Sequence, residues 1–207
     1  MNKITALLIA LFFFFLMSEA AQPVNVNEII GNNQSVTAKA NVGTSTWVGT
    51  TNGLYIVSGK KTIHLTTENS VLPSNSVTGI AVTTDGNVYV ATSKGIFRFD
   101  GYAYLVINNE NSNLPVNGIT SIAADKNDNL WVGTSASGLI LMNNYKCRFF
   151  DNHNSVLTSN NVATVKSDAN GNVFVQLANK DVVKIGEKNM VVITAPVIIE
   201  NATASSK

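Results

Sequence analysis

The chain has 207 residues, with 14 basic and 13 acidic side chains and a formal net charge of +1. A charge so close to zero provides no long-range field to attract nucleic acid or an anionic membrane surface, and we expect neither as a partner. Only 13% of the residues are charged and 45% are hydrophobic, a composition that suits an all-β protein with many polar turns.

The first 20 residues have the three parts of a secretory signal peptide. Lys3 supplies the basic start, residues 4–17 form an apolar run, and Ser18-Glu19-Ala20 fits a cleavage site. The run has 14 residues, fewer than the roughly 18 to 20 that a membrane-spanning helix needs. We therefore predict a signal peptide at 1–20, a mature domain at 21–207 with no membrane span, and a periplasmic or secreted location. An uncleaved membrane anchor is the alternative.

Cys147 is the only cysteine of the chain, so this exported protein has no internal disulfide and depends on packing for its stability. In a strand it would share a face with Tyr145 and Phe149. We expect a buried, inert thiol rather than a reactive or intermolecular one.

The mature chain repeats itself about every 42 residues. Segments such as Trp47-Val48-Gly49-Thr50 recur in order, and their aromatic residues are spaced by 42, 42 and 43 positions. These aromatic residues are Trp47, Tyr89, Trp131 and Phe174. Shortly after each comes a turn, whose glycine is Gly53, Gly95 or Gly138 in the first three copies and is replaced by Asp181 in the fourth. The fourth copy is the degenerate one.

Each period contains signals for four strands. A Leu-Pro-x-Asn type block opens a strand, a tight Asp/Asn/Gly turn follows, and the aromatic strand comes next. In the second copy a third strand at 96–99 and a fourth at 102–107 complete the period. We predict an all-β fold of four antiparallel four-stranded blades, at about 32–71, 72–113, 114–156 and 157–198. A β-propeller is the leading architecture, as a small closed ring or an open arc.

The repeated aromatic residues and glycines have a structural interpretation. A bulky ring at one place in each blade fills the wedge between neighbouring sheets, and the turn glycines serve the backbone. We therefore assign Trp47, Tyr89, Trp131, Phe174, Gly53, Gly95 and Gly138 to the structural core of the repeats rather than to a ligand site.

The motifs resemble the two-component regulator propeller repeat family. The segments 114–122, 125–134 and 95–101, together with Gly138-Leu139, match its pattern, with Asp128 where the family has Gly. The resemblance covers roughly residues 31–194. It implies a relation to the periplasmic sensor halves of hybrid two-component proteins, which detect carbohydrate breakdown products and carry many more repeats than the four counted here.

Four asparagines occupy equivalent places, 14 residues before each aromatic residue: Asn33, Asn75, Asn117 and Asn160. They lie in the loops that lead into the first strand of each blade, and such loops surround one mouth of a propeller. Because each amide offers a donor and an acceptor, we consider the four as ligand-binding residues for a glycan or a peptide backbone. The alternative is that each Asn bonds to its own turn.

The sequence gives no sign of a cofactor or a metal site. His64 and His153 lie in different copies at non-equivalent positions, and one cysteine is available. Streptogramin lyases have similar repeats and depend on His and Glu residues, so a lyase-like enzyme is an alternative that these two scattered histidines do not favour. We predict no enzyme activity.

Three functional hypotheses follow. The first is an exported, non-enzymatic binding module for a glycan or a protein partner. The second is a structural propeller fragment that forms homo-oligomers or pairs with another propeller through blade edges. The third is the streptogramin-lyase-like enzyme.

Overall fold

The computed structural model describes residues 31, 35–115, 118–168, 170–186 and 190–193, and these form sixteen strands in four sheets. The predicted signal peptide at 1–20 lies outside the described residues. Among those described, no helix is long and apolar enough to cross a membrane.

Each sheet is an antiparallel meander of four consecutive strands, as the repeat predicted. Blade 1 contains β1 (Val36–Val42), β2 (Ser45–Thr50), β3 (Gly53–Ser58) and β4 (Lys61–Leu65). Blade 2 contains β5 (Val77–Val82), β6 (Val88–Thr92), β7 (Gly95–Phe99) and β8 (Tyr104–Ile107). Blade 3 contains β9 (Ile119–Ala124), β10 (Leu130–Thr134), β11 (Leu139–Asn143) and β12 (Lys146–Phe150). Blade 4 contains β13 (Val162–Ser167), β14 (Val173–Leu177), β15 (Val182–Ile185) and β16 (Met190–Ile193).

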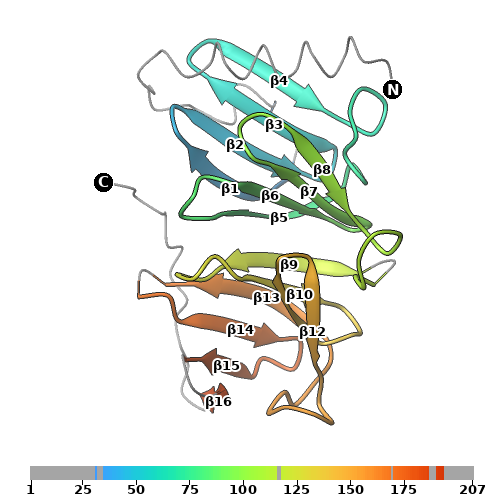
Figure 1. The fold of residues 1–207 in the computed structure, drawn as a ribbon, viewed down its shortest axis with the longest axis vertical. Coiled ribbons are helices and arrows are strands. Elements are labelled where there is room, and N and C mark those ends of the chain that lie inside the picture. Colours follow the sequence, from blue (N-terminus) through green and yellow to red (C-terminus); the bar gives the residue numbers. More distant parts are fainter. Residues whose placement is uncertain (1–30, 32–34, 116–117, 169, 187–189, 194–207) are drawn as a thin grey trace.

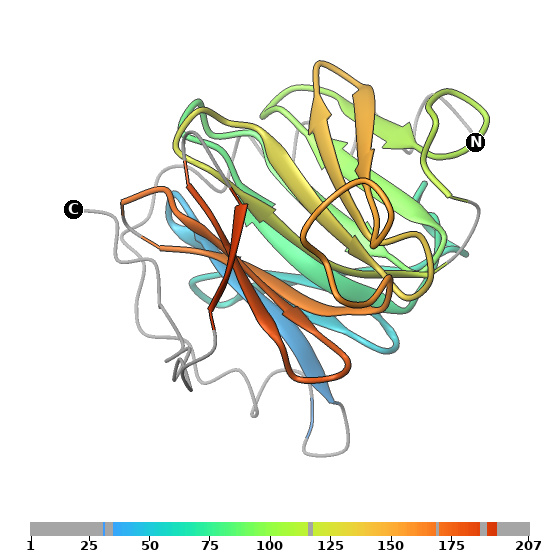
Figure 2. The same cartoon turned by 90° about the horizontal axis from the view of Figure 1, so that it is seen from below.

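The four blades form an open array. Their first strands follow one another, with β1 beside β5, β5 beside β9, and β9 beside β13. Blades 1 and 4 lie at opposite ends of the molecule (Figure 1), and the blades overlap when seen along the long axis (Figure 2). The described strands therefore have the propeller-type architecture without closing into a ring.

Three apolar clusters hold the array together, one between each pair of neighbouring blades. Between blades 1 and 2 the cluster centres on Trp47, which is 1% exposed, and between blades 3 and 4 it includes Trp131, which is 6% exposed. Tyr89 is half-buried against the cluster between blades 2 and 3. Phe174 is also half-buried, but it faces away from blade 3, with Lys184 Nζ 5.8 Å from its ring centroid.

The recurring threonine after the small residue ties each central hairpin together. Thr50, Thr92 and Thr134 are buried, and each donates its hydroxyl hydrogen to a turn glycine carbonyl at 2.8 to 2.9 Å. These carbonyls belong to Gly53, Gly95 and Gly138, all of which have positive φ. In blade 4 Leu177 replaces the threonine, so the hydroxyl bond is lost and the backbone N–H of Leu177 donates to the carbonyl of Asp181, as that of Thr134 does to Gly138.

Candidate functional site

At two of three repeat positions, the residues that fill the wedge between neighbouring blades become smaller along the chain. The face of blade 2 that packs on blade 1 presents Phe97, Phe99 and Tyr104. By strand register the matching residues of blade 3 are Ile140, Met142 and Cys147, and those of blade 4 are Val183, Ile185 and Met190. Since the partner faces keep large side chains, the last wedge is underfilled.

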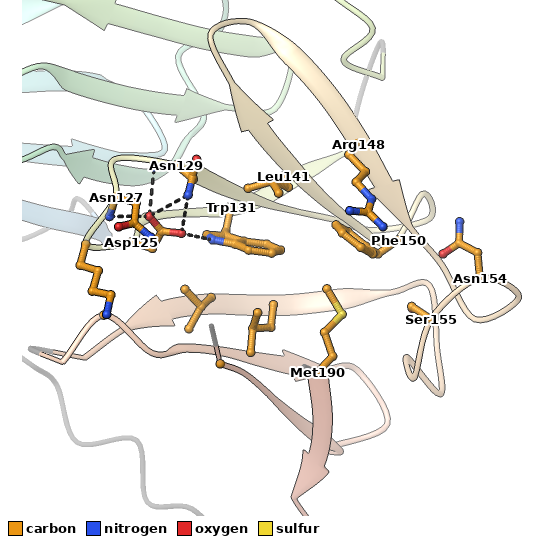
Figure 3. A pocket seen from close by; sticks show the side chains of 15 residues that line it. Asp125, Asn127, Asn129, Trp131, Leu141, Arg148, Phe150, Asn154, Ser155 and Met190 are labelled. Atoms are coloured by element: carbon orange, nitrogen blue, oxygen red, sulfur yellow. Dashed lines mark hydrogen bonds between the residues drawn. The ribbon is translucent and has the colours of Figure 1, made fainter. Parts of the chain in front are cut away.

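A groove of about 430 Å³ lies in this last wedge, between blades 3 and 4. Figure 3 shows one wall from blade 3, with Trp131, Leu141 and Phe150, and Met190 on the opposite side. Val173 and Ile185 complete the apolar lining. Polar residues from the β9–β10 turn stand at one end of the groove, and residues of the loop after β12 stand at the other. An apolar trough with polar ends is the usual form of a small-molecule site.

The polar end at the β9–β10 turn is built around one carboxylate. Asp125 Oδ1 accepts from the backbone N–H groups of Asn127 at 2.9 Å and Asn129 at 3.0 Å. Its Oδ2 accepts from Asn129 Nδ2 at 3.0 Å and from the indole Nε1 of Trp131 at 3.0 Å. These bonds, drawn in Figure 3, fix the indole against the groove wall and use both carboxylate oxygens.

The wall of the groove that blade 3 forms also carries an exposed arginine. Arg148 projects from β12, and its guanidinium carbon lies 4.9 Å from the centroid of the Phe150 ring. Stacking on an aromatic face holds a guanidinium in position while leaving the N–H donors at its edge available. Asn154 and Ser155, in the loop after β12, line the same end of the groove.

The structure places two of the four predicted ligand-binding asparagines, while Asn33 and Asn117 lie outside the described residues. Asn75 Oδ1 accepts the backbone N–H of Thr67, and Asn160 Oδ1 accepts that of Asn152, both at 2.8 Å. Both asparagines are half-buried, and neither lines the groove between blades 3 and 4.

The same two asparagines also connect neighbouring blades. The carbonyl of Asn75 accepts the N–H of Gly53 at 2.7 Å, and that of Asn160 accepts the N–H of Gly138 at 2.9 Å. The turn of one blade is thereby bonded to the loop that leads into the next. The alternative in which each Asn bonds to its own turn concerns the side-chain amides, and these accept backbone N–H groups of the loop that precedes the blade.

The two histidines have separate local environments. His64 stacks on Tyr55 with a centroid distance of 4.0 Å, and its Nε2 lies 2.8 Å from the carbonyl of Asn52. His153 is exposed in the loop after β12, and its Nδ1 lies 3.7 Å from Asp151 Oδ1. Within the described part of the chain, no three His, Cys, Asp or Glu side chains gather as a metal site would require.

Sequence reasoning did not single out the groove residues Arg148, Phe150, Ile185 and Met190. The repeat pattern hid them because their positions vary in residue type while the aromatic and glycine positions recur. The decrease in side-chain volume from Phe97 to Val183 at one repeat position was the available signal.

Comparison with known families supports the repeat assignment. Residues 71–94 and 113–136 match the sequence model of the two component regulator propeller family. Two segments of the chain thus match the two component regulator propeller repeat. The matched segments cover the loop, first strand and aromatic strand of blades 2 and 3. No curated protein sequence matches the chain significantly.

Several solved structures share the fold of these propeller repeats. The extracellular domain of BT4673 from B. thetaiotaomicron, assigned to a hybrid two component system, aligns with a TM-score of 0.64 and 20% identity over 86% of this chain. PorZ, a surface component of the type-IX secretion system of Porphyromonas gingivalis, aligns with a TM-score of 0.52 and 21% identity over 72% of it. Virginiamycin B lyase from Staphylococcus aureus aligns with a TM-score of 0.56 and 12% identity over 88% of this chain.

The alignments span only part of the larger proteins. They cover 27% of the BT4673 chain, 25% of the PorZ chain and 60% of the lyase chain. At these identities the likeness establishes the fold of the propeller repeats, and a fold supports many activities.

Proposed function

We propose that this protein is an exported, non-enzymatic binding module that takes up a glycan in the groove between blades 3 and 4. The observation that carries the proposal is the groove itself, about 430 Å³ in volume, with the rings of Trp131 and Phe150 in one wall. Aromatic rings beside polar donors and acceptors suit the faces and hydroxyls of a sugar. An extracellular sensor domain and a bacterial surface protein among the structural neighbours support an extracytoplasmic location.

A binding role suits the groove better than a catalytic one. Asp125, the one carboxylate among the described lining residues, already accepts hydrogen bonds from the turn and from Trp131. A general base needs a lone pair directed at a substrate proton. Neither histidine lines the groove. The lyases among the structural neighbours share the fold, and a shared fold does not by itself imply a shared chemistry.

The test is a calorimetric titration of the purified exported protein with neutral and acidic oligosaccharides of two to six sugars. Ile185→Phe adds the ring that Phe99 supplies at the same repeat position of blade 2, and it should fill the groove and abolish binding. Val191→Phe adds the same ring to blade 4 at a residue 50% exposed, outside the groove lining, and should leave affinity unchanged. Oligosaccharides that fail to bind the unmodified protein, or that bind the Ile185→Phe variant equally well, would refute the proposal.

The open array favours assembly as a second candidate role. Blades 1 and 4 each have a face against which no described blade packs, and Val191 stands 50% exposed on blade 4. Propeller faces of this kind can pair with a second copy or with another propeller. Light scattering on the purified protein distinguishes the roles, because a monomeric mass contradicts self-assembly and a dimeric mass supports it.

A further inference from the structure

The charges around the groove are unequal. Arg148 and Lys126 line it, and Asp125 is the one carboxylate among its described lining residues. That carboxylate accepts four hydrogen bonds at 2.9 to 3.0 Å, which leave little capacity for a ligand. Arg148 therefore supplies the positive charge that we consider for ligand binding, while the charge of Asp125 is used by hydrogen bonds within the protein.

Arg98, which faces the wedge between blades 2 and 3 at the repeat position of Leu141, has its two terminal guanidinium nitrogens engaged within its own blade. Arg98 donates from Nη2 to Asn87 Oδ1 at 2.9 Å, and its Nη1 lies 3.5 Å from Asp100 Oδ2. Its side chain is 22% exposed, and it serves the packing of blade 2. This arrangement holds the guanidinium within its own blade.

Arg148 is placed differently. It is exposed, it stacks on Phe150 at 4.9 Å, and no ion pair joins it to a carboxylate within the described residues. Glu187 lies outside the described residues, and its charge is tested by substitution. A guanidinium stacked on a ring and presenting its N–H edge at a groove is suited to bind a carboxylate in a bidentate manner.

We propose that the groove selects acidic sugars, with the carboxylate of a uronic acid bound by Arg148 and the sugar ring lying in the apolar trough. This inference rests on the proposed glycan-binding function and specifies the class of glycan. Phe150 positions the guanidinium.

The experiment compares two matched probes, trigalacturonic acid and its fully methyl-esterified form, by calorimetry on the whole exported protein. The two share the same sugar chain, but their carboxyl groups are charged in the acid and are neutral methyl esters in the other probe. We expect the acid to bind about tenfold or more tightly than the ester, since hydrogen bonds to charged groups are the stronger ones. Arg148→Gln should reduce this preference to about twofold or less. Lys60→Gln, which removes an exposed cation from blade 1, and Glu187→Gln should preserve it.

Each outcome decides between the two proposals. Equal affinity for acid and ester, or a preference that survives Arg148→Gln, overturns the acidic-sugar inference, and glycan binding stands if Ile185→Phe abolishes it. Failure of both probes to bind, together with failure of the wider oligosaccharide panel, overturns both. Binding of a Glu-rich peptide, but of no sugar, through Arg148 assigns the groove to an acidic protein partner and also overturns both.

Discussion

Gly133 of β10 faces Val162 of β13 so closely that a Cβ atom on residue 133 would lie 2.6 Å from Val162 Cγ1. Gly49 has the same relation to Val77, with a corresponding distance of 2.4 Å. A small residue at this repeat position therefore allows the first strand of the next blade to pack closely. At the matching place in blade 4 stands Gln176, on a face against which no described blade packs. A polar outer face of this kind is typical of a terminal repeat.

Gly133→Ala should destabilise the protein, because the added methyl group meets Val162 and forces blades 3 and 4 apart. We expect the free energy of unfolding to fall by about 1–3 kcal/mol, the usual cost of overpacking. The matched control is Gln176→Ala, which alters the same repeat position where no described blade follows and should change stability by about 0.5 kcal/mol or less. Urea denaturation measures both. Equal effects of the two substitutions would show that the close approach is not what requires glycine.

Asn160→Ala should loosen the loop that leads into blade 4 by removing the acceptor for the backbone N–H of Asn152. A lost hydrogen bond of this kind costs about 1 kcal/mol. Asn152→Ala is the control, because that N–H and its bond to Asn160 remain. Thermal unfolding reports stability, and the oligosaccharide titration reports binding. A variant that keeps its stability but loses glycan affinity would instead support the ligand role that the sequence suggests for Asn160.

The repeat made the architecture predictable from sequence. Strand boundaries followed from alternating side chains and from turn residues such as those around Gly53 and Gly95, both of which adopt positive φ. These are local signals, and each of the four periods repeats them. The blade arrangement itself follows because each sheet has an apolar face that needs a neighbour.

The candidate site was not predictable in the same way. The groove depends on the difference between Phe99, Met142 and Ile185 at one repeat position, and a pattern search removes such differences by averaging over the copies. The sequence also could not decide whether the blades close into a ring. Closure depends on the rotation between neighbouring blades, a small geometric quantity that no motif encodes.

Acid should weaken the fold through the carboxylate of Asp168. Burial raises the pKa of this group, but hydrogen bonds from the Asn172 side chain and from the backbone N–H groups of Asn172 and Asn170 outweigh it, so the pKa lies below its ordinary value of 3.8. A pKa lower in the folded state than in the unfolded state stabilises the fold above pH 3.8, and that stabilisation disappears as the pH falls through the folded value.

Asp168→Asn tests this linkage. The variant should be less stable than the unmodified protein at pH 7, by less than about 1 kcal/mol because the carboxylate is partly solvated. The difference should shrink as the pH is lowered from 5 to 2.5 in a series of urea denaturation curves. A difference that stays constant with pH would mean that the carboxylate stabilises the turn by shape alone.

Cys147 should react slowly in the folded protein. Its side chain is half-buried against the cluster between blades 2 and 3, and this burial raises the pKa of the thiol, opposed by a hydrogen bond from the backbone of Asn113. Burial limits the access of a reagent to the sulfur, and the raised pKa lowers the fraction of thiolate, which is the nucleophile. Both effects reduce the rate of reaction with a disulfide reagent at pH 8. Ser135→Cys supplies an exposed reference thiol when introduced into a Cys147→Ser background. We expect Cys147 to react about tenfold more slowly than this reference, and to match it in urea. Equal rates in the native protein would show that β12 opens readily, since a thiol held in the wedge reacts only after local unfolding exposes it.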